Sequence, residues 1–139
     1  QMRMTNTVPA LPVHDIEKAV NFYQCKLGFT CAYQDKGFAK IIRDRVEIHL
    51  WAAYDKSWKW RSILLFLKPV FSGAETFIAG THSCRIEVEE IDNFYSEFKK
   101  KEMLYSPETL MEETSWGTRE FPVLDLDRNL LTFYEQIEN

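Results

Sequence analysis

The sequence lacks several features that would place it in a common class of protein. Its three cysteines, Cys25, Cys31 and Cys84, are odd in number and have no CxxC spacing, so neither a disulfide framework nor a zinc knuckle is expected. The longest purely apolar run, at 63–67, is too short to cross a bilayer. The N-terminal residues have no apolar core of a signal peptide. These absences predict a cytoplasmic protein in a reducing compartment, with no membrane partner.

A basic surface and the common catalytic motifs are also missing. The chain has 21 acidic and 17 basic residues, which gives a net charge of −4. Nucleic acid is therefore not an expected partner, because phosphate binding needs a basic surface, whereas a cationic small molecule is compatible with this charge. The sequence contains no Ser-His-Asp relay, phosphate-binding glycine loop or dinucleotide fingerprint. Its 139 residues fit one soluble domain, 1–139, with a sizeable core.

The clearest local pattern is a β-hairpin near the C-terminus. Residues 118–124 and 130–135 are rich in β-branched and aromatic side chains, and the Asp and Asn residues at 125–129 indicate a tight turn that caps its own backbone. Because side chains alternate along a strand, Leu131 and Phe133 should face a covering helix. Thr132 and Tyr134 should then face the opposite side of the sheet.

The first half of the chain has the pattern of a βαβββ unit. A strand is expected at 5–13, at a sheet edge because of its prolines, followed by three strands at 29–34, 38–43 and 46–51. Between the first two of these strands, Asp15 and Gly28 are the expected N-terminal and C-terminal caps of a helix. That helix should bury an apolar stripe with helical spacing, made of Ile16, Ala19, Val20, Tyr23 and Leu27.

The second half repeats this pattern. A strand is expected at 83–88, and Glu90 follows it at the position that corresponds to Asp15. The apolar residues at 91, 94, 95 and 98 lie 75 positions after those at 16, 19, 20 and 23. A further strand is expected within 103–111. The sequence therefore predicts an α+β fold of two tandem βαβββ modules, at about 5–52 and 82–137, with helices on the outer face of the sheet. The connecting segment, about 53–81, is either a covering helix plus loop or an arm that reaches a partner subunit.

Strand alternation also indicates where a ligand could bind. The side chains that face away from the helices are mixed aromatic and charged, which is typical of a cleft or a subunit interface. They include Glu47, His49 and Trp51 in the first module, and Arg85, Thr132 and Tyr134 in the second.

Three segments carry a family resemblance: VHDIEKAVNFYQCKLGF at 13–29, CRIEVEEIDNFY at 84–95 and SWGTREFPVLDLDRNLLTFYE at 115–135. With the duplicated βαβββ unit, they resemble the vicinal oxygen chelate superfamily, also called the glyoxalase/bleomycin-resistance/dioxygenase fold, and imply a curved mixed sheet. Enzymes of that superfamily hold a divalent metal through four side chains, whose positions here carry Val8, His49, Ser83 and Thr132. Only His49 is a good ligand, so the resemblance implies neither a metal nor another cofactor, with His49 as the residual metal candidate.

The remaining pattern is similar to the bleomycin-resistance branch, whose members are homodimers that sequester a cationic glycopeptide antibiotic. This resemblance implies antibiotic resistance by binding a partly aromatic ligand that can be cationic, with no catalytic residue. The expected ligand-binding residues are Phe38, Glu47, His49, Trp51, Arg85, Trp116, Thr132 and Tyr134. Two other functions stay open: a metal-dependent lyase, isomerase or dioxygenase that uses His49 with Glu47 or Glu87, and a small-molecule sensor. The aromatic residues could also serve packing between modules alone.

Overall fold

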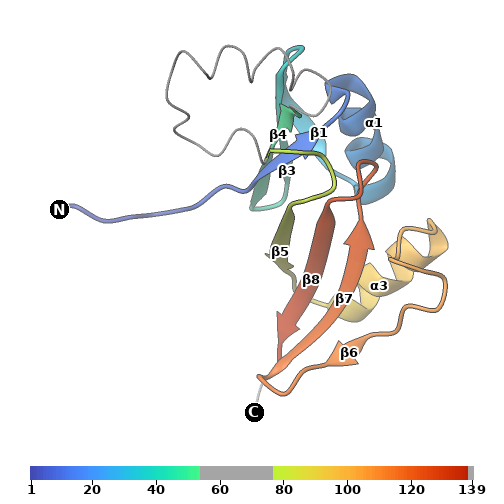
Figure 1. The fold of residues 1–139 in the computed structure, drawn as a ribbon. Coiled ribbons are helices and arrows are strands. Elements are labelled where there is room, and N and C mark those ends of the chain that lie inside the picture. Colours follow the sequence, from blue (N-terminus) through green and yellow to red (C-terminus); the bar gives the residue numbers. More distant parts are fainter. Residues whose placement is uncertain (54–76, 138–139) are drawn as a thin grey trace.

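The computed structural model describes residues 1–53 and 77–137, which form two βαβββ modules (Figure 1). The first contains β1 (Ala10–Val13), α1 (Ile16–Leu27), β2 (Thr30–Gln34), β3 (Phe38–Arg43) and β4 (Val46–Ala52). The second contains β5 (Ser83–Glu87), α3 (Ile91–Lys100), β6 (Glu112–Glu113), β7 (Thr118–Leu124) and β8 (Leu130–Gln136). The sheet orders are β1-β4-β3-β2 and β5-β8-β7-β6. In each sheet the first strand pairs in parallel with the last and the other pairs are antiparallel, so the predicted fold and duplication are confirmed.

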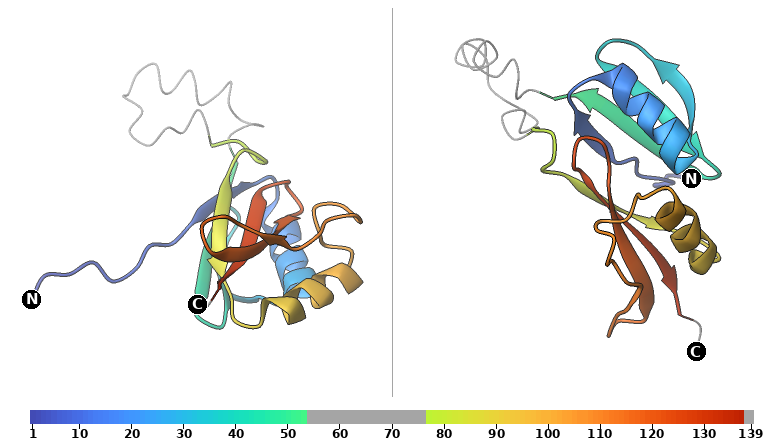
Figure 2. Two further views of the ribbon diagram at one scale, coloured as in Figure 1. Left: turned by 90° about the horizontal axis from the view of Figure 1, so that it is seen from below. Right: turned by 90° about the vertical axis from the view of Figure 1, so that its right-hand side faces the viewer.

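Each helix covers one face of its own sheet, and both helices lie on the same side of the molecule (Figures 1 and 2). The five residues of the predicted α1 stripe are all buried, and Leu131 and Phe133 are buried on the sheet of the second module. Under α3 the ring of Phe98 lies 5.0 Å from that of Phe133. The predicted alternation along β4 and β8 is therefore confirmed, and the opposite faces of the sheets remain for other contacts.

The ends of α1 are capped as predicted. The Asp15 carboxylate accepts a hydrogen bond of 3.0 Å from the Lys18 backbone N–H, and Gly28 ends the helix in the left-handed region at φ 74°. A side chain at Gly28 would also collide with Arg43, since its Cβ would lie 2.7 Å from Nη1. Arg43 uses that nitrogen to donate to the Leu27 carbonyl at 2.7 Å, which ties β3 to the end of the helix.

The start of α3 differs from the prediction. Glu90 occupies the N-cap position, but its φ of 59° is left-handed and its side chain makes no capping hydrogen bond. Instead the Glu135 carboxylate on β8 accepts from the backbone N–H groups of Glu90 at 3.0 Å and Ile91 at 3.3 Å. A carboxylate near a helix N-terminus is favourable for the helix dipole as well. The second module therefore caps its helix from a distant strand, whereas the first uses a local residue.

Replacing Glu135 with alanine is expected to lower the free energy of unfolding by about 0.5–2 kcal/mol, the usual cost of losing an N-terminal cap. The measurement is urea denaturation followed by circular dichroism. Glu108→Ala is the matched control, because Glu108 is exposed and should change stability by less than about 0.5 kcal/mol. Equal stability of the two variants would contradict the capping role of Glu135.

Two predicted strands have different bounds in the structure. The strand expected at 5–13 begins only at Ala10, and residues 1–7 extend away from the body of the fold (Figure 1). The strand expected within 103–111 is wrong: only an isolated bridge between Leu104 and Val123 forms there, and the edge strand is Glu112–Glu113. The physical reason is a local turn, in which the Ser106 N–H donates to the Thr109 hydroxyl at 2.8 Å and Thr109 N–H donates back to the Ser106 carbonyl at 3.0 Å.

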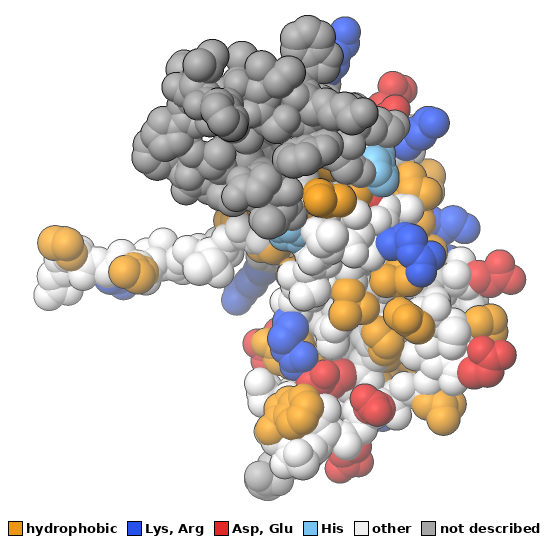
Figure 3. Space-filling view, in the orientation of Figure 1, with side chains coloured by type: hydrophobic (Ala, Val, Ile, Leu, Met, Phe, Trp, Pro, Cys, Tyr) orange, Lys and Arg blue, Asp and Glu red, His pale blue; other side chains and the backbone are white. Residues whose placement is uncertain are grey.

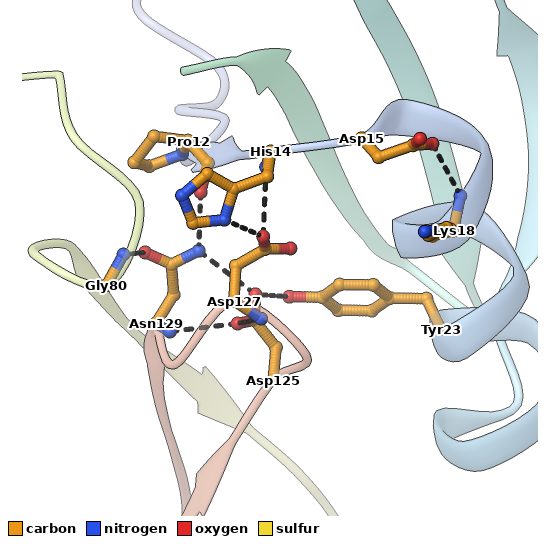
Figure 4. Close-up of polar contacts among 9 residues, drawn as sticks. All are labelled: Pro12, His14, Asp15, Lys18, Tyr23, Gly80, Asp125, Asp127 and Asn129. Atoms are coloured by element: carbon orange, nitrogen blue, oxygen red, sulfur yellow. Dashed lines mark hydrogen bonds and ion pairs between the residues drawn. The ribbon is translucent and has the colours of Figure 1, made fainter. Parts of the chain in front are cut away.

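The β7–β8 turn joins the two modules through a buried polar network, which we call the turn clamp (Figure 4). Asp125 Oδ1 accepts from the Asn129 N–H at 2.8 Å, and Oδ2 accepts from the Tyr23 hydroxyl of α1 at 2.7 Å. Asn129 is fully buried. Its amide donates to the Pro12 carbonyl at 2.8 Å, and its oxygen accepts from Gly80 N–H at 3.1 Å. The predicted self-capping turn is confirmed, and it also reaches β1 and α1.

A second carboxylate of the turn clamp binds the segment between β1 and α1. Asp127 Oδ1 lies 2.9 Å from the His14 backbone N–H and 2.8 Å from His14 Nδ1 (Figure 4). Burial raises the pKa of Asp125, while its hydrogen bonds from Tyr23 and Asn129 act in the opposite direction. The turn therefore positions two carboxylates at the junction between the modules.

Within the described residues, no helix is long and apolar enough to cross a membrane. The hypotheses for the connecting segment, about 53–81, fall mainly on residues 54–76, which lie outside the described residues.

Candidate functional site

The first module carries an aromatic group on the side of its sheet that faces away from α1. Phe38 and Trp51 are direct cross-strand partners on β3 and β4, and their ring centroids lie 4.5 Å apart. The His49 ring is 5.0 Å from Phe38, and the Tyr33 ring is 6.0 Å from it. We call these four residues the aromatic face. Trp51 and Tyr33 remain 44% and 52% exposed, so their rings are available to a ligand.

A carboxylate holds the histidine of the aromatic face in place. His49 Nε2 lies 2.6 Å from Glu47 Oε2, and both side chains are partly exposed. Glu47 and His49 are two positions apart on β4, so their side chains project from the same side of the sheet. The pair therefore places one negatively charged group beside the aromatic rings, as sequence alternation predicted.

The second module carries a charged group on the equivalent face, which we call the arginine cluster: Arg85, Thr118, Glu120 and Tyr134. The Arg85 guanidinium lies over the Tyr134 ring at 4.5 Å from its centroid. Arg85 forms an ion pair with Glu120, with one Nη1 to Oε1 distance of 3.2 Å. The Thr118 hydroxyl donates to the same carboxylate at 2.7 Å. Arg85 and Thr118 thus both donate to the Glu120 carboxylate and fix its position.

These contacts shift the ionisation of the cluster. Hydrogen bonding to Arg85 is the main cause that lowers the pKa of Glu120, and the hydrogen bonds from Thr118 and Trp116 act in the same direction. The pKa of Arg85 is raised, chiefly by its hydrogen bond to Glu120. Both members of the pair are therefore charged at neutral pH.

The lowered pKa of Glu120 predicts a pH-dependent contribution to stability. In the unfolded chain its pKa returns to about 4.3, so the folded state is favoured above that value and loses this contribution as pH falls through the folded-state pKa. The free energy of unfolding of Glu120→Gln should therefore fall less steeply than that of the wild type between neutral pH and acid. Urea unfolding at a series of pH values measures this.

Glu108→Gln removes an exposed carboxylate and should follow the wild-type pH profile. Parallel profiles for Glu120→Gln and the wild type would show that the ion pair adds nothing to the folded state.

The eight predicted ligand-binding residues lie in or next to these two groups. Phe38, Glu47, His49 and Trp51 lie together on β3 and β4. Arg85 and Tyr134 are in contact, and Thr132 is the direct neighbour of Arg85 in the β5–β8 register. Trp116, 68% exposed, lies in the turn between β6 and β7 and hydrogen bonds to Glu120. In the described part of the chain, no hydrogen bond, ion pair or ring contact joins one group to the other.

Sequence reasoning missed three members of these groups. Glu120 and Thr118 lie opposite Tyr134 and Gln136 in the hairpin register, so the alternation used for β8 would have found them if it had been extended to β7. Tyr33 was harder to place, because the pairing of β2 with β3 has a register shift between Cys31 and Tyr33. A bulge of this kind turns the following side chain to the other face.

A cleft lies elsewhere, where the β3–β4 turn meets β5 and the start of α3. Its volume is about 870 Å³, and none of the eight predicted residues lines it. Five carboxylates and two guanidinium groups do: Asp44, Glu87, Glu89, Glu90, Glu135, Arg43 and Arg45. In Figure 3, hydrophobic side chains instead gather over the sheet of the second module, with basic and acidic side chains around them. The predicted residues therefore lie on sheet faces outside this cleft.

The donor set does not fit the divalent metal that the superfamily implies. The four corresponding positions carry Val8, His49, Ser83 and Thr132, and a valine with two neutral hydroxyl groups gives a poor environment for a divalent ion. Among the described residues, no three His, Cys, Asp or Glu side chains are grouped to hold a metal ion.

The chain is similar to known bleomycin resistance proteins along its whole length. Residues 5–41 match the bleomycin resistance protein-like N-terminal family model. In structure, the bleomycin-binding protein of Streptomyces verticillus, solved with copper(II)-bleomycin, shares 22% identity and a TM-score of 0.72 over 100% of both chains. The bleomycin resistance determinant of transposon Tn5 shares 20% identity and a TM-score of 0.69 over 96% of this chain and 98% of its own.

These two structures show the fold, and a relative in sequence shows the family. The bleomycin resistance protein of Geobacillus stearothermophilus is 47% identical over 136 residues, which are 98% of this chain and 100% of the relative. The same fold, this coverage of both chains and this identity lead to one conclusion: the chain belongs to the bleomycin resistance protein family.

Proposed function

We propose that this protein binds bleomycin-type antibiotics and confers resistance by stoichiometric capture, without catalysis. The observation that carries the proposal is the aromatic face, where Phe38 and Trp51 pack at 4.5 Å and Trp51 stays 44% exposed. Offset aromatic pairs contribute about 0.5–1.5 kcal/mol beyond the area that they bury. A flat heteroaromatic ring of the ligand would pack against the exposed indole of Trp51. The relatives named above bear the name of bleomycin resistance or were solved with the drug, which supports the choice of ligand.

The charges beside these rings support a cationic ligand. Glu47 lies next to the aromatic face through its contact with His49, and the chain as a whole has a net charge of −4. Complementary charge adds specificity and speeds association. We assign the ligand-binding role to Phe38, Glu47, His49 and Trp51 in the first module and to Arg85, Trp116, Thr132 and Tyr134 in the second.

The same proposal includes a homodimer located in the cytoplasm. Trp51 and Tyr33 of the aromatic face stay partly exposed in a single chain, and drug-sized ligands are usually buried over most of their surface, so a second copy would supply further enclosure. Residues 1–7 extend away from the fold with Met2 and Met4 fully exposed, which offers a segment for contact with the second copy. Light scattering that gives the mass of one chain would remove the dimer from the proposal.

The test is a titration of the chelator-treated protein with metal-free bleomycin, followed by tryptophan fluorescence and calorimetry. We expect saturable binding that is stoichiometric with the chain. No saturation at high drug concentration would overturn the proposal. Metal analysis of protein purified without chelator is the second arm, since one tightly held divalent ion per chain would favour a metal-dependent enzyme instead.

A further inference from the structure

Arg85 places a positive charge on a face that is proposed to receive a cationic ligand. Its side chain is 48% exposed, and it lies over Tyr134 and beside Thr132, two of the residues assigned to ligand binding. An uncompensated guanidinium at this point would repel the positive group of the ligand. The face is therefore compatible with a cation only if the charge of Arg85 is neutralised locally.

Glu120 lies in the position to do this. Its carboxylate binds Arg85 through both oxygens, with 3.2 Å between Nη1 and Oε1, and its own side chain is only 11% exposed. Thr118, 3% exposed, donates to Oε2 at 2.7 Å. A carboxylate with two donors in a bidentate pair has a defined geometry. The guanidinium is thereby held between a buried anion on β7 and the ring of Tyr134 on β8.

Resting on the bleomycin-binding function proposed above, we propose that Glu120 is the specificity-determining residue of the second module. It neutralises Arg85 and holds the guanidinium over Tyr134, so that a planar ring of the ligand stacks on the exposed side of the guanidinium while a cationic substituent is tolerated beside it. Arginine suits this role because its guanidinium is planar, weakly hydrated and stacks on aromatic rings. The ligand class is a heteroaromatic ring that carries a positive charge.

Two ligands and a double-mutant cycle separate this role from a merely structural one. The ligands are metal-free bleomycin and its analogue in which the cationic tail is replaced by a free carboxylate. The quantity measured by calorimetry is the ratio of the two dissociation constants, analogue over bleomycin, in the wild type, Glu120→Gln, Arg85→Gln and the double variant. Glu108→Gln changes the net charge equally at an exposed position and serves as the control.

We expect Glu120→Gln to lower this preference for the cation by about five- to tenfold. Arg85→Gln should raise it, because the Glu120 carboxylate then faces the ligand without its partner. In the double variant the preference should return close to the wild-type value, and Glu108→Gln should leave it unchanged. Since Arg85 is half exposed, its variant also provides the test if Glu120→Gln fails to fold.

An unchanged preference in Arg85→Gln, or a preference in the double variant that stays as low as in Glu120→Gln alone, would overturn the role of Glu120. Either result is distinct from failure of the proposed function, in which the wild type itself does not bind bleomycin and this inference falls with it.

Discussion

An Asn129→Ala variant is expected to lose about 2–4 kcal/mol of its free energy of unfolding, because it removes the fully buried amide at the centre of the turn clamp. The amide donates to the Pro12 carbonyl at 2.8 Å and to Asp125 at 3.1 Å, and its oxygen accepts from the Gly80 N–H. Alanine makes none of these hydrogen bonds. A buried polar group that loses its partner costs about 1–3 kcal/mol, which is more than the net contribution of the bond itself.

Urea denaturation followed by fluorescence measures this loss, with Asn93→Ala as the matched control. Asn93 is exposed on α3, so its replacement should change stability by less than about 0.5 kcal/mol. A small effect at Asn129, equal to that at Asn93, would mean that water replaces the amide and that the turn clamp does not hold the modules together.

A Trp51→Ala variant is expected to bind metal-free bleomycin about 10- to 100-fold more weakly, which corresponds to about 1.4–2.8 kcal/mol. The indole is the more exposed member of the tilted Phe38–Trp51 pair, with its ring 4.5 Å from that of Phe38. Its removal takes away both the stacking partner and the apolar area that a ligand ring would cover. Because the side chain is 44% exposed, the folded state should lose little stability, so the change in affinity can be read directly.

Calorimetric titration measures this effect, and two further variants make it specific. Trp51→Phe keeps an aromatic ring at this position and should retain most of the affinity. Tyr105→Ala removes another exposed aromatic side chain, 57% exposed, which contacts neither group in the described residues, and should bind as the wild type does. Equal affinities of Trp51→Ala and the wild type would place the ligand away from the aromatic face.

Local sequence patterns were sufficient to predict most of the fold. The spacing of Ile16, Ala19, Val20, Tyr23 and Leu27 predicted the buried face of α1, and the bounds of β3 and β7 agree with the prediction. These elements follow from hydrophobic periodicity and turn chemistry, which act over a few residues. The duplication then supplied the topology, because two copies of one pattern predict two copies of one unit.

The predictions failed where a distant residue determines the local structure. Glu90 resembles Asp15 in sequence, yet Glu135, 45 residues away, caps α3. The contacts of Asn129 with Pro12 and of Tyr23 with Asp125 span 117 and 102 residues, and no local pattern reports them. For the candidate site, alternation correctly placed side chains on a face, but it did not show that Arg85 and Glu120 form a pair. Pairing of this kind depends on strand register, which a single sequence specifies only weakly.

The parallel pairing of first and last strands has a consequence for synthesis of the chain. In the first module β1 pairs with β4, and in the second β5 pairs with β8. In each case the first strand of the module can pair only after the last strand of that module has been translated. Contacts of long sequence separation form late, because the chain entropy of the intervening loop must be lost first. The first module can therefore close on the ribosome while the second is still being translated. Asn129 lies in the β7–β8 turn, so the junction between the modules can form only after β7 of the second module has been translated.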